Sequence, residues 1–113
     1  MSRDLFDEER RMDRLARLKG LVEENPQDRF ARYGLAMELS SQGRLEESVG
    51  EFRALISLDP GYVASYFQAG QTLEKLYRVE EAREVYRKGM EVAERRGDTK
   101  TRGELESALN LLD

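Results

Sequence analysis

Apolar and polar positions between Asn25 and Glu94 follow one pattern that occurs twice. The segment RLEES at residues 44–48 recurs as RVEEA at residues 78–82, an offset of 34 residues. The same offset pairs Tyr33 with Phe67, Ala36 with Gly70, Leu39 with Leu73, Phe52 with Tyr86, Ile56 with Met90 and Leu58 with Val92. A fixed period of about 20–50 residues is typical of stacked structural repeats. The pattern therefore predicts a repeat architecture.

Each copy contains two stretches in which apolar residues recur every three or four positions, the spacing of an amphipathic helix. In the first copy these stretches end at Gly43, which favours a helix C-terminus, and before Pro60, which disfavours helical backbone in the residue ahead of it. The predicted helices cover residues 27–41, 45–58, 62–76 and 79–96.

Two positions carry special expectations. Tyr77 stands where Gly43 stands in the first copy, so equivalent turns give Tyr77 a left-handed backbone at a cost of roughly 1 kcal/mol. Gly70 and Ala82 are small residues at the places where facing helices are expected to approach most closely. A larger side chain there is expected to overpack the crossing by about 1–3 kcal/mol.

A helix over residues 6–24 is predicted ahead of the first copy, and residues 1–5 are expected to fray. Its apolar stripe consists of Leu15, Leu18, Leu21 and Val22. At the offset of 34 residues Leu18 falls on Phe52, so this helix corresponds to the second half of a repeat.

A last helix is predicted over residues 98–112, capped by Asp98 or by a capping box of Thr101 and Glu104. Its apolar stripe is Leu105, Ala108, Leu109 and Leu112, with Glu104, Ser107 and Asn110 facing outward. The helix does not continue the 34-residue period. It is predicted to be the polar-backed cap that the end of a repeat stack needs.

These elements predict a single all-α domain of about six antiparallel helices without a sheet. Its parts are a half-repeat at 6–24, repeats at 27–60 and 61–96, and a capping helix at 98–112. The length of 113 residues suits one domain.

The composition argues against several classes of function. The net charge is −4, from 19 basic and 23 acidic residues, which argues against a general nucleic-acid binder. Cysteine and histidine are absent, which removes the thiol nucleophile and the commonest metal ligand and general base. Neither a membrane-spanning run nor an apolar signal core is present, so the cytoplasm is the expected location.

The two copies resemble the tetratricopeptide repeat, a 34-residue helix–turn–helix unit. The family's bulky, small and aromatic positions fall in the second copy on Tyr66, Ala69, Gly70, Leu73, Ala82, Tyr86 and Gly89. The first copy keeps the family's proline as Pro60 but has Arg32 at a bulky position. Glu94 replaces the proline in the second copy, so its last helix is expected to run on toward Arg96. The resemblance implies helices stacked in a right-handed superhelix.

The family lines its inner surface with the first helix of each repeat. The inward positions fall on Phe30, Tyr33, Met37 and Ser41 in the first copy, and on Ala64, Phe67, Gln71 and Lys75 in the second. From these the predicted partner-binding residues are Phe30, Tyr33, Met37, Phe67, Gln71 and Lys75. An apolar patch with a polar rim often marks a protein-binding site.

Leu35, Ala36 and Leu39 already supply the face that packs on the next helix, which leaves Tyr33 and Met37 surplus to that contact. Tyr33, Met37 and Phe67 are therefore expected to be partly exposed on one continuous concave surface. The alternative interpretation is that two repeats curve too little to form a groove, so the predicted side chains pack on neighbouring helices or on residues 1–5. Some family members bind a C-terminal carboxylate through a lysine and an asparagine. Tyr33 and Met37 stand at those positions, which argues against a chaperone-tail adaptor.

The predicted function is a non-enzymatic module that binds a protein or peptide partner, without cofactor or metal. Glu46-Glu47 and Glu80-Glu81 could be imagined as acid–base pairs, but acidic residues in a first helical turn are usually exposed partners of the helix dipole. Two alternatives stay open. One is a homodimer formed through the same surface. The other is a nucleic-acid accessory that uses Arg10, Arg14 and Arg17, a stripe that otherwise forms a solvated face.

Overall fold

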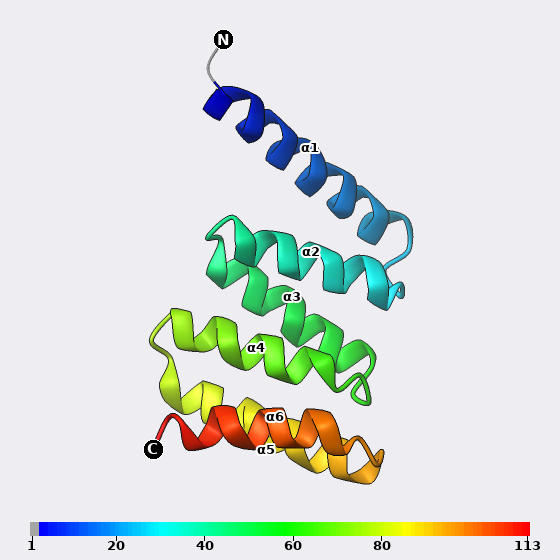
Figure 1. Cartoon of the computed structure of the whole chain (residues 1–113). Helices are drawn as coiled ribbons and strands as arrows, with labels where there is room; N and C mark the ends of the chain where they lie inside the picture. The colour runs from blue at the N-terminus through cyan, green and yellow to red at the C-terminus, as the bar shows by residue number, and fades with distance from the viewer. Residues whose placement is uncertain (1–2) are drawn as a thin grey trace.

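The computed structural model describes residues 3–113, which form six helices and no strand (Figure 1). The helices are α1 (Arg3–Glu24), α2 (Arg29–Ser41), α3 (Leu45–Leu58), α4 (Ala64–Lys75), α5 (Val79–Arg95) and α6 (Thr99–Asn110). The predicted all-α repeat fold is confirmed. The fraying expected at residues 1–5 falls partly on residues 1–2, outside the described part, and helical backbone already begins at Arg3.

The helices follow one another along one long axis, from α1 at one end to α5 and α6 at the other (Figure 1). The described residues extend 49 × 31 × 21 Å. Each helix packs on the next one in the sequence, and α6 contacts α4 as well as α5. Contacts between neighbours in sequence dominate, as expected for a linear stack.

Three helices end in the same way, although one of them does so without glycine. Gly43 and Gly97 have φ of 78° and 70°, and Tyr77 has φ of 60°. In the first of these turns Arg44 N donates to Leu39 O at 2.9 Å, and the turn at Tyr77 repeats that bond. The predicted left-handed backbone at Tyr77 is therefore present, on a side chain that is 90% exposed.

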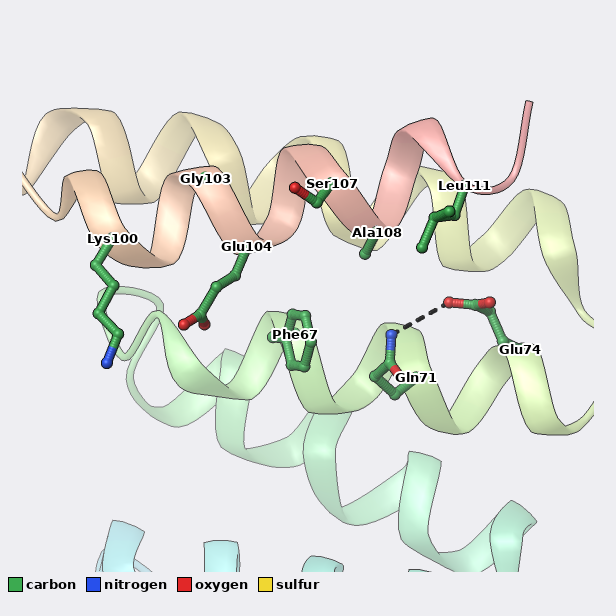
Figure 2. A pocket seen from close by; sticks show the side chains of 9 residues that line it. All are labelled: Phe67, Gln71, Glu74, Lys100, Gly103, Glu104, Ser107, Ala108 and Leu111. Carbon is green, nitrogen blue, oxygen red and sulfur yellow. Dashed lines mark hydrogen bonds between the residues drawn. The ribbon is translucent and has the colours of Figure 1, made fainter.

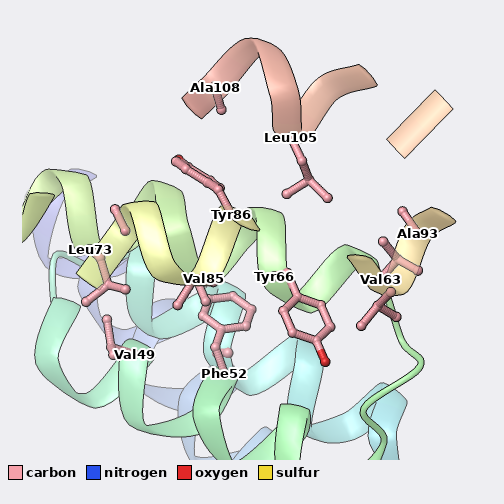
Figure 3. Close-up of a cluster of buried hydrophobic side chains, with 14 residues drawn as sticks. Val49, Phe52, Val63, Tyr66, Leu73, Val85, Tyr86, Ala93, Leu105 and Ala108 are labelled. Atoms are coloured by element: carbon pink, nitrogen blue, oxygen red, sulfur yellow. The ribbon is translucent and has the colours of Figure 1, made fainter. Parts of the chain in front are cut away.

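Small residues and aromatic rings alternate through the core, as the repeat pattern predicts. Ser48 donates its hydroxyl to the carbonyl oxygen of Ala36 at 2.7 Å, where α2 and α3 cross. At the equivalent crossing a Cβ added to Gly70 would lie 2.1 Å from Cε1 of Tyr86. Figure 3 shows the core continuing to α6, whose Leu105 is fully buried. The last helix is thus packed into the same core as the two repeats.

The structure tests two sequence expectations about helix ends. Asp98 is the N-cap of α6, because its carboxylate accepts a bond from Thr101 N at 3.0 Å, so the capping box of Thr101 with Glu104 was wrong. The second repeat's last helix does run past the position of the missing proline. It includes Glu94 and ends at Arg95.

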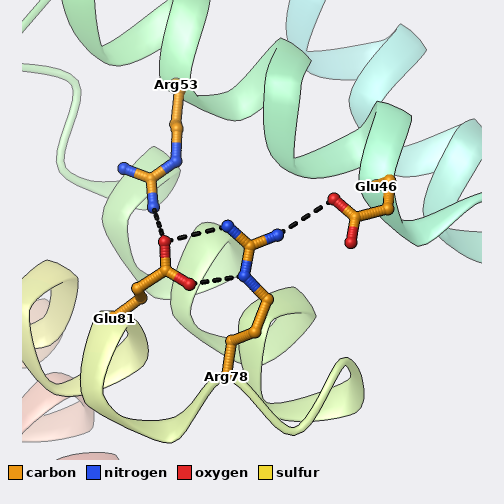
Figure 4. A network of polar contacts seen from close by, with 4 residues as sticks. All are labelled: Glu46, Arg53, Arg78 and Glu81. Atoms are coloured by element: carbon orange, nitrogen blue, oxygen red, sulfur yellow. Dashed lines mark hydrogen bonds and ion pairs between the residues drawn. The ribbon is translucent and has the colours of Figure 1, made fainter.

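A charged network joins the two repeats on the surface (Figure 4). Arg78 Nη1 lies 2.9 Å from Glu46 Oε2, and Arg53 Nη2 lies 3.2 Å from Glu81 Oε1. The hydrogen bonds from Arg78 hold the pKa of Glu81 below its ordinary value. Glu46 therefore pairs with Arg78 between the recurring RLEES and RVEEA segments, and Glu81 pairs with Arg53 farther along α3. Such exposed pairs contribute little to stability individually.

Candidate functional site

A hollow of about 700 Å³ lies between α4 and α6 (Figure 2). It is lined by Phe67, Gln71, Glu74, Lys100, Gly103, Glu104, Ser107, Ala108 and Leu111. Figure 2 shows Lys100, Glu104 and Leu111 reaching from α6 toward α4. Phe67 and Gln71 were predicted to be binding residues, whereas the helix that forms the opposite wall was predicted to be a cap.

The hollow brings together equivalent positions of successive repeats when α6 is aligned with α4 at an offset of 36 residues in place of 34. The offset from the second copy to α6 is 36 residues, which places Ala69 on Leu105 and Leu73 on Leu109. The N-caps Asp28 and Asp98 are 70 residues apart, the sum of one offset of 34 and one of 36. The helix α6 therefore packs where the first helix of a third repeat unit would lie. The offset changes because α5 is longer than its counterpart α3, with 17 residues against 14, so the helix after it begins later in the repeat.

At this offset the four inward positions of α4 fall on residues of α6 that line the hollow. Ala64, Phe67, Gln71 and Lys75 correspond to Lys100, Gly103, Ser107 and Leu111. Sequence reasoning missed these residues because the period was held at 34. The signal that could have found them is the recurrence of Asp28 as Asp98 ahead of a leucine-containing helix.

The hollow is open because two aromatic positions lose their counterparts. The ring of Tyr33 packs edge-on against the ring of Phe52, with ring centres 5.9 Å apart. It also packs at a tilt against the ring of Tyr62, with ring centres 5.6 Å apart. Its equivalent Phe67 keeps the first contact, with Tyr86 at 6.3 Å. The counterparts that would follow in α6 and its cap are Gly103 and Asp98. A Cβ added to Gly103 meets nothing within 4 Å, so the space beside Phe67 is unfilled.

One end of the hollow is fixed by a buried hydrogen-bonded group. Gln71 Nε2 donates to Tyr86 Oη at 2.6 Å, and that hydroxyl donates to Glu74 Oε2. Burial and the bond to Glu74 raise the pKa of Tyr86 above its ordinary value. Gln71 and Glu74 are therefore held in place by the core, while Glu104 and Lys100 at the other end are exposed.

The remaining predicted binding residues lie outside this hollow. Phe30 is 68% exposed and Met37 is 37% exposed, and Lys75 is exposed as well. Tyr33 and Phe67 are half-buried, and the ring of Tyr33 packs against the core residue Phe52 and against Tyr62. The partial exposure expected of Tyr33, Met37 and Phe67 is therefore confirmed, whereas the expectation that Tyr33 is surplus to helix packing was wrong.

Other surface features supply less chemistry. Arg14 pairs with Glu38 on α2 at 3.1 Å, and the Arg10 guanidinium lies 5.2 Å from the ring centre of Phe6. Among the described residues no group of acidic side chains is arranged to hold a metal ion. No helix between residues 3 and 113 is both long and apolar enough to cross a bilayer.

This arrangement defines a helical-repeat protein whose first helices present a row of equivalent positions. The sequence profile of the tetratricopeptide repeat matches residues 1–63 and 33–90, which together exceed half of the chain. The chain belongs to the tetratricopeptide repeat family. The comparison with curated proteins found no match.

Solved structures agree with this assignment. The crystal structure of a tetratricopeptide repeat domain protein from Salinibacter ruber is 34% identical, with a TM-score of 0.70, and the match covers 75% of this chain and 94% of that one. YrrB, described as having an unusual peptide-binding site, is 27% identical over 91% of this chain and 52% of its own, with a TM-score of 0.74. The TPR2B domain of yeast Sti1, described as a complex with pHsp70, is 13% identical over 96% of this chain and 87% of that one, with a TM-score of 0.83. That last likeness shows the fold alone.

Proteins of this family commonly mediate protein–protein interactions and generally act as scaffolds without enzymatic activity. The family thus supports a binding role at a coarse level.

Proposed function

We propose that this chain binds a peptide segment of a partner protein across the first helices of its repeats, α2, α4 and α6. The observation that carries this proposal is the hollow between α4 and α6, which lies on equivalent positions of successive repeats. Its lining combines the apolar Phe67, Ala108 and Leu111 with a few polar groups, the composition typical of binding sites.

The exposed side chains of α2 extend the same proposal. Phe30 and Met37 are large apolar residues that remain exposed on α2, the first helix of the repeat before the one that carries Phe67. Their exposure is consistent with a contact that a partner completes, since isolated apolar side chains gain about 1.5–3 kcal/mol on full burial. YrrB, a relative at 27% identity, has a peptide-binding site, which supports peptide as the ligand class.

The test is selection of binders from a random dodecapeptide display library, followed by anisotropy titration of the labelled peptides. Substituting Met37→Ala together with Phe67→Ala is expected to weaken binding at least tenfold. Tyr77→Ala is the matched control, because it removes a large exposed aromatic ring that lies outside the hollow. Titrations are made well below the melting temperature of each variant, since Phe67 also packs on Tyr86.

A library that yields no binder, or binders whose affinity is unchanged by the double substitution, contradicts the proposal. Self-association through the same exposed side chains remains the second candidate, because Phe30 and Met37 could be covered by another copy. Molar mass by light scattering over a range of concentrations distinguishes it, since the double substitution then lowers the mass and leaves peptide binding absent.

A further inference from the structure

We propose that the hollow between α4 and α6 takes an aromatic side chain of the bound peptide, and that a basic residue next to it pairs with Glu104. This inference rests on the proposed function, because it specifies the chemistry of the peptide bound there. It makes α6 the helix that selects the ligand.

The first argument comes from the missing aromatic contact of Phe67. In the first repeat, Tyr33 has the ring of Tyr62 as a second partner, with ring centres 5.6 Å apart. The residue equivalent to Tyr62 in the next unit is Asp98, and Phe67 keeps just the contact with Tyr86 among the aromatic pairs of residues 3–113. A ligand ring beside Phe67 would restore the second contact. Aromatic pairs of this kind contribute more than their buried area alone.

The second argument concerns space. Gly103 occupies the position that is Tyr33 in the first repeat and Phe67 in the second. Nothing lies within 4 Å of a Cβ added there, and the volume of about 700 Å³ exceeds that of one aromatic side chain. The floor beside it is apolar, since Ala108 and Leu111 line it. The hollow therefore admits a ring together with neighbouring parts of a peptide.

The third argument is charge complementarity. Figure 2 shows the Glu104 carboxylate directed from α6 toward α4, beside Phe67. No ion pair of Glu104 occurs among residues 3–113, whereas Glu74 accepts the bonds of Tyr86 and Gln71. A cationic side chain in the ligand would therefore find Glu104 as its partner at the edge of the hollow.

The protein contains an arrangement of the same chemistry. The guanidinium of Arg29 lies 5.2 Å from the ring centre of Tyr62 and 5.1 Å from that of Phe30. Its Nη1 also lies 2.6 Å from Asp59 Oδ2. An aromatic ring, a basic group and a carboxylate thus meet on this fold already. A ligand with adjacent aromatic and basic residues would form the corresponding cluster with Phe67 and Glu104.

The experiment uses the dodecapeptides selected on the whole chain. We expect the selected sequences to share an aromatic residue adjacent to lysine or arginine, and replacing that aromatic residue by alanine to weaken binding at least tenfold. Gly103→Leu places an apolar side chain in the hollow at a position where an added Cβ meets nothing within 4 Å, and it is expected to weaken binding to a similar extent. Gly50→Leu is the matched control, because Gly50 is also a helical glycine with nothing within 4 Å of an added Cβ.

A charge exchange tests the second half of the inference. Glu104→Lys is expected to weaken binding of the basic peptide, and changing the basic residue of the peptide to glutamate should recover affinity for this variant. Selected peptides without the aromatic–basic pair, or equal binding to Gly103→Leu and Gly50→Leu, overturn the inference while peptide binding itself stands. A library without any binder contradicts the proposed function instead.

Discussion

Tyr77 is a single residue on which the geometry of a whole turn depends. Its φ of 60° requires a conformation that glycine adopts freely and that costs other residues roughly 1 kcal/mol. The side chain is 90% exposed, so little packing offsets that cost. We expect Tyr77→Gly to be neutral or to stabilise the protein by up to about 1 kcal/mol, because relief of strain exceeds or balances the larger unfolded-state entropy of glycine. Urea denaturation measures the change.

The equivalent turn supplies the control. Gly43→Ala places a Cβ at a φ of 78° and should destabilise the protein by about 1 kcal/mol or more. A loss of stability in Tyr77→Gly would show that the tyrosine side chain makes a contribution that its exposure does not suggest.

Gly70 shows the opposite requirement, for space rather than for backbone freedom. A methyl group there would lie 2.1 Å from Cε1 of Tyr86, a ring that is fully buried. Gly70→Ala is therefore expected to destabilise the protein by about 1–3 kcal/mol. Gly50→Ala, in open space on a helix, should stabilise it by about 1 kcal/mol through helix propensity alone. Midpoints of urea unfolding for the pair would contradict this reasoning if both substitutions changed stability in the same direction.

The structural role of a residue was predictable from the sequence where the repeat pattern constrains it. It was less predictable where a side chain also contacts a residue outside the pattern. The small residues Ala36 and Gly70 and the left-handed Tyr77 follow from comparing two copies. The packing of Tyr33 did not, because its ring contacts Tyr62, which was predicted to begin a helix but lies in the connection before α4. An aromatic residue in a connecting segment changes the environment of a predicted surface residue without altering the repeat pattern.

At the scale of the elements, the carboxylate that caps α6 should make stability depend on pH. The bond from the backbone of Thr101 lowers the pKa of Asp98 from its ordinary value of 3.8. The stabilisation from this group is thus complete above about pH 4, where the unfolded chain also carries the charge. It is lost as the pH falls through the lower pKa of the folded state.

Asp98→Asn isolates that effect, because asparagine retains a capping oxygen but does not titrate in this range. Between about pH 4 and pH 2 the unfolding midpoint of the wild type should fall more steeply than that of Asp98→Asn. Parallel curves for the two proteins would show that the cap bond does not favour the charged form.

The elements also show where sequence reasoning succeeds. Gly43 and Pro60 interrupt the first copy so clearly that α3 was predicted with its observed bounds, residues 45–58. The role of α6 was not predictable at a constant period of 34, because α5 continues through Glu94 and moves the next helix by two residues. The hollow that depends on α6 was missed for the same reason.

At the scale of the whole molecule, the linear stack predicts unequal local stability. The helix α1 packs mainly on α2, whereas α4 packs on α3, α5 and α6. Native-state hydrogen exchange should therefore show smaller opening free energies for amides in α1 than for amides in α4. Leu15→Ala, which removes a buried contact between α1 and the leucines of α2, should accelerate exchange in α1 and leave α4 nearly unchanged. Equal acceleration in both helices would indicate one cooperative unit.

The same linear order has a mechanical consequence. Because each helix is held chiefly by its sequence neighbours, a force applied to the two ends of the chain acts first on the outermost contacts. The helix α1, with its small leucine core, should detach before the aromatic core between α2 and α6 yields. Under tension the molecule would lengthen in steps. After the first step α1 would act as an extensible segment, while the peptide-facing helices α2, α4 and α6 stay assembled.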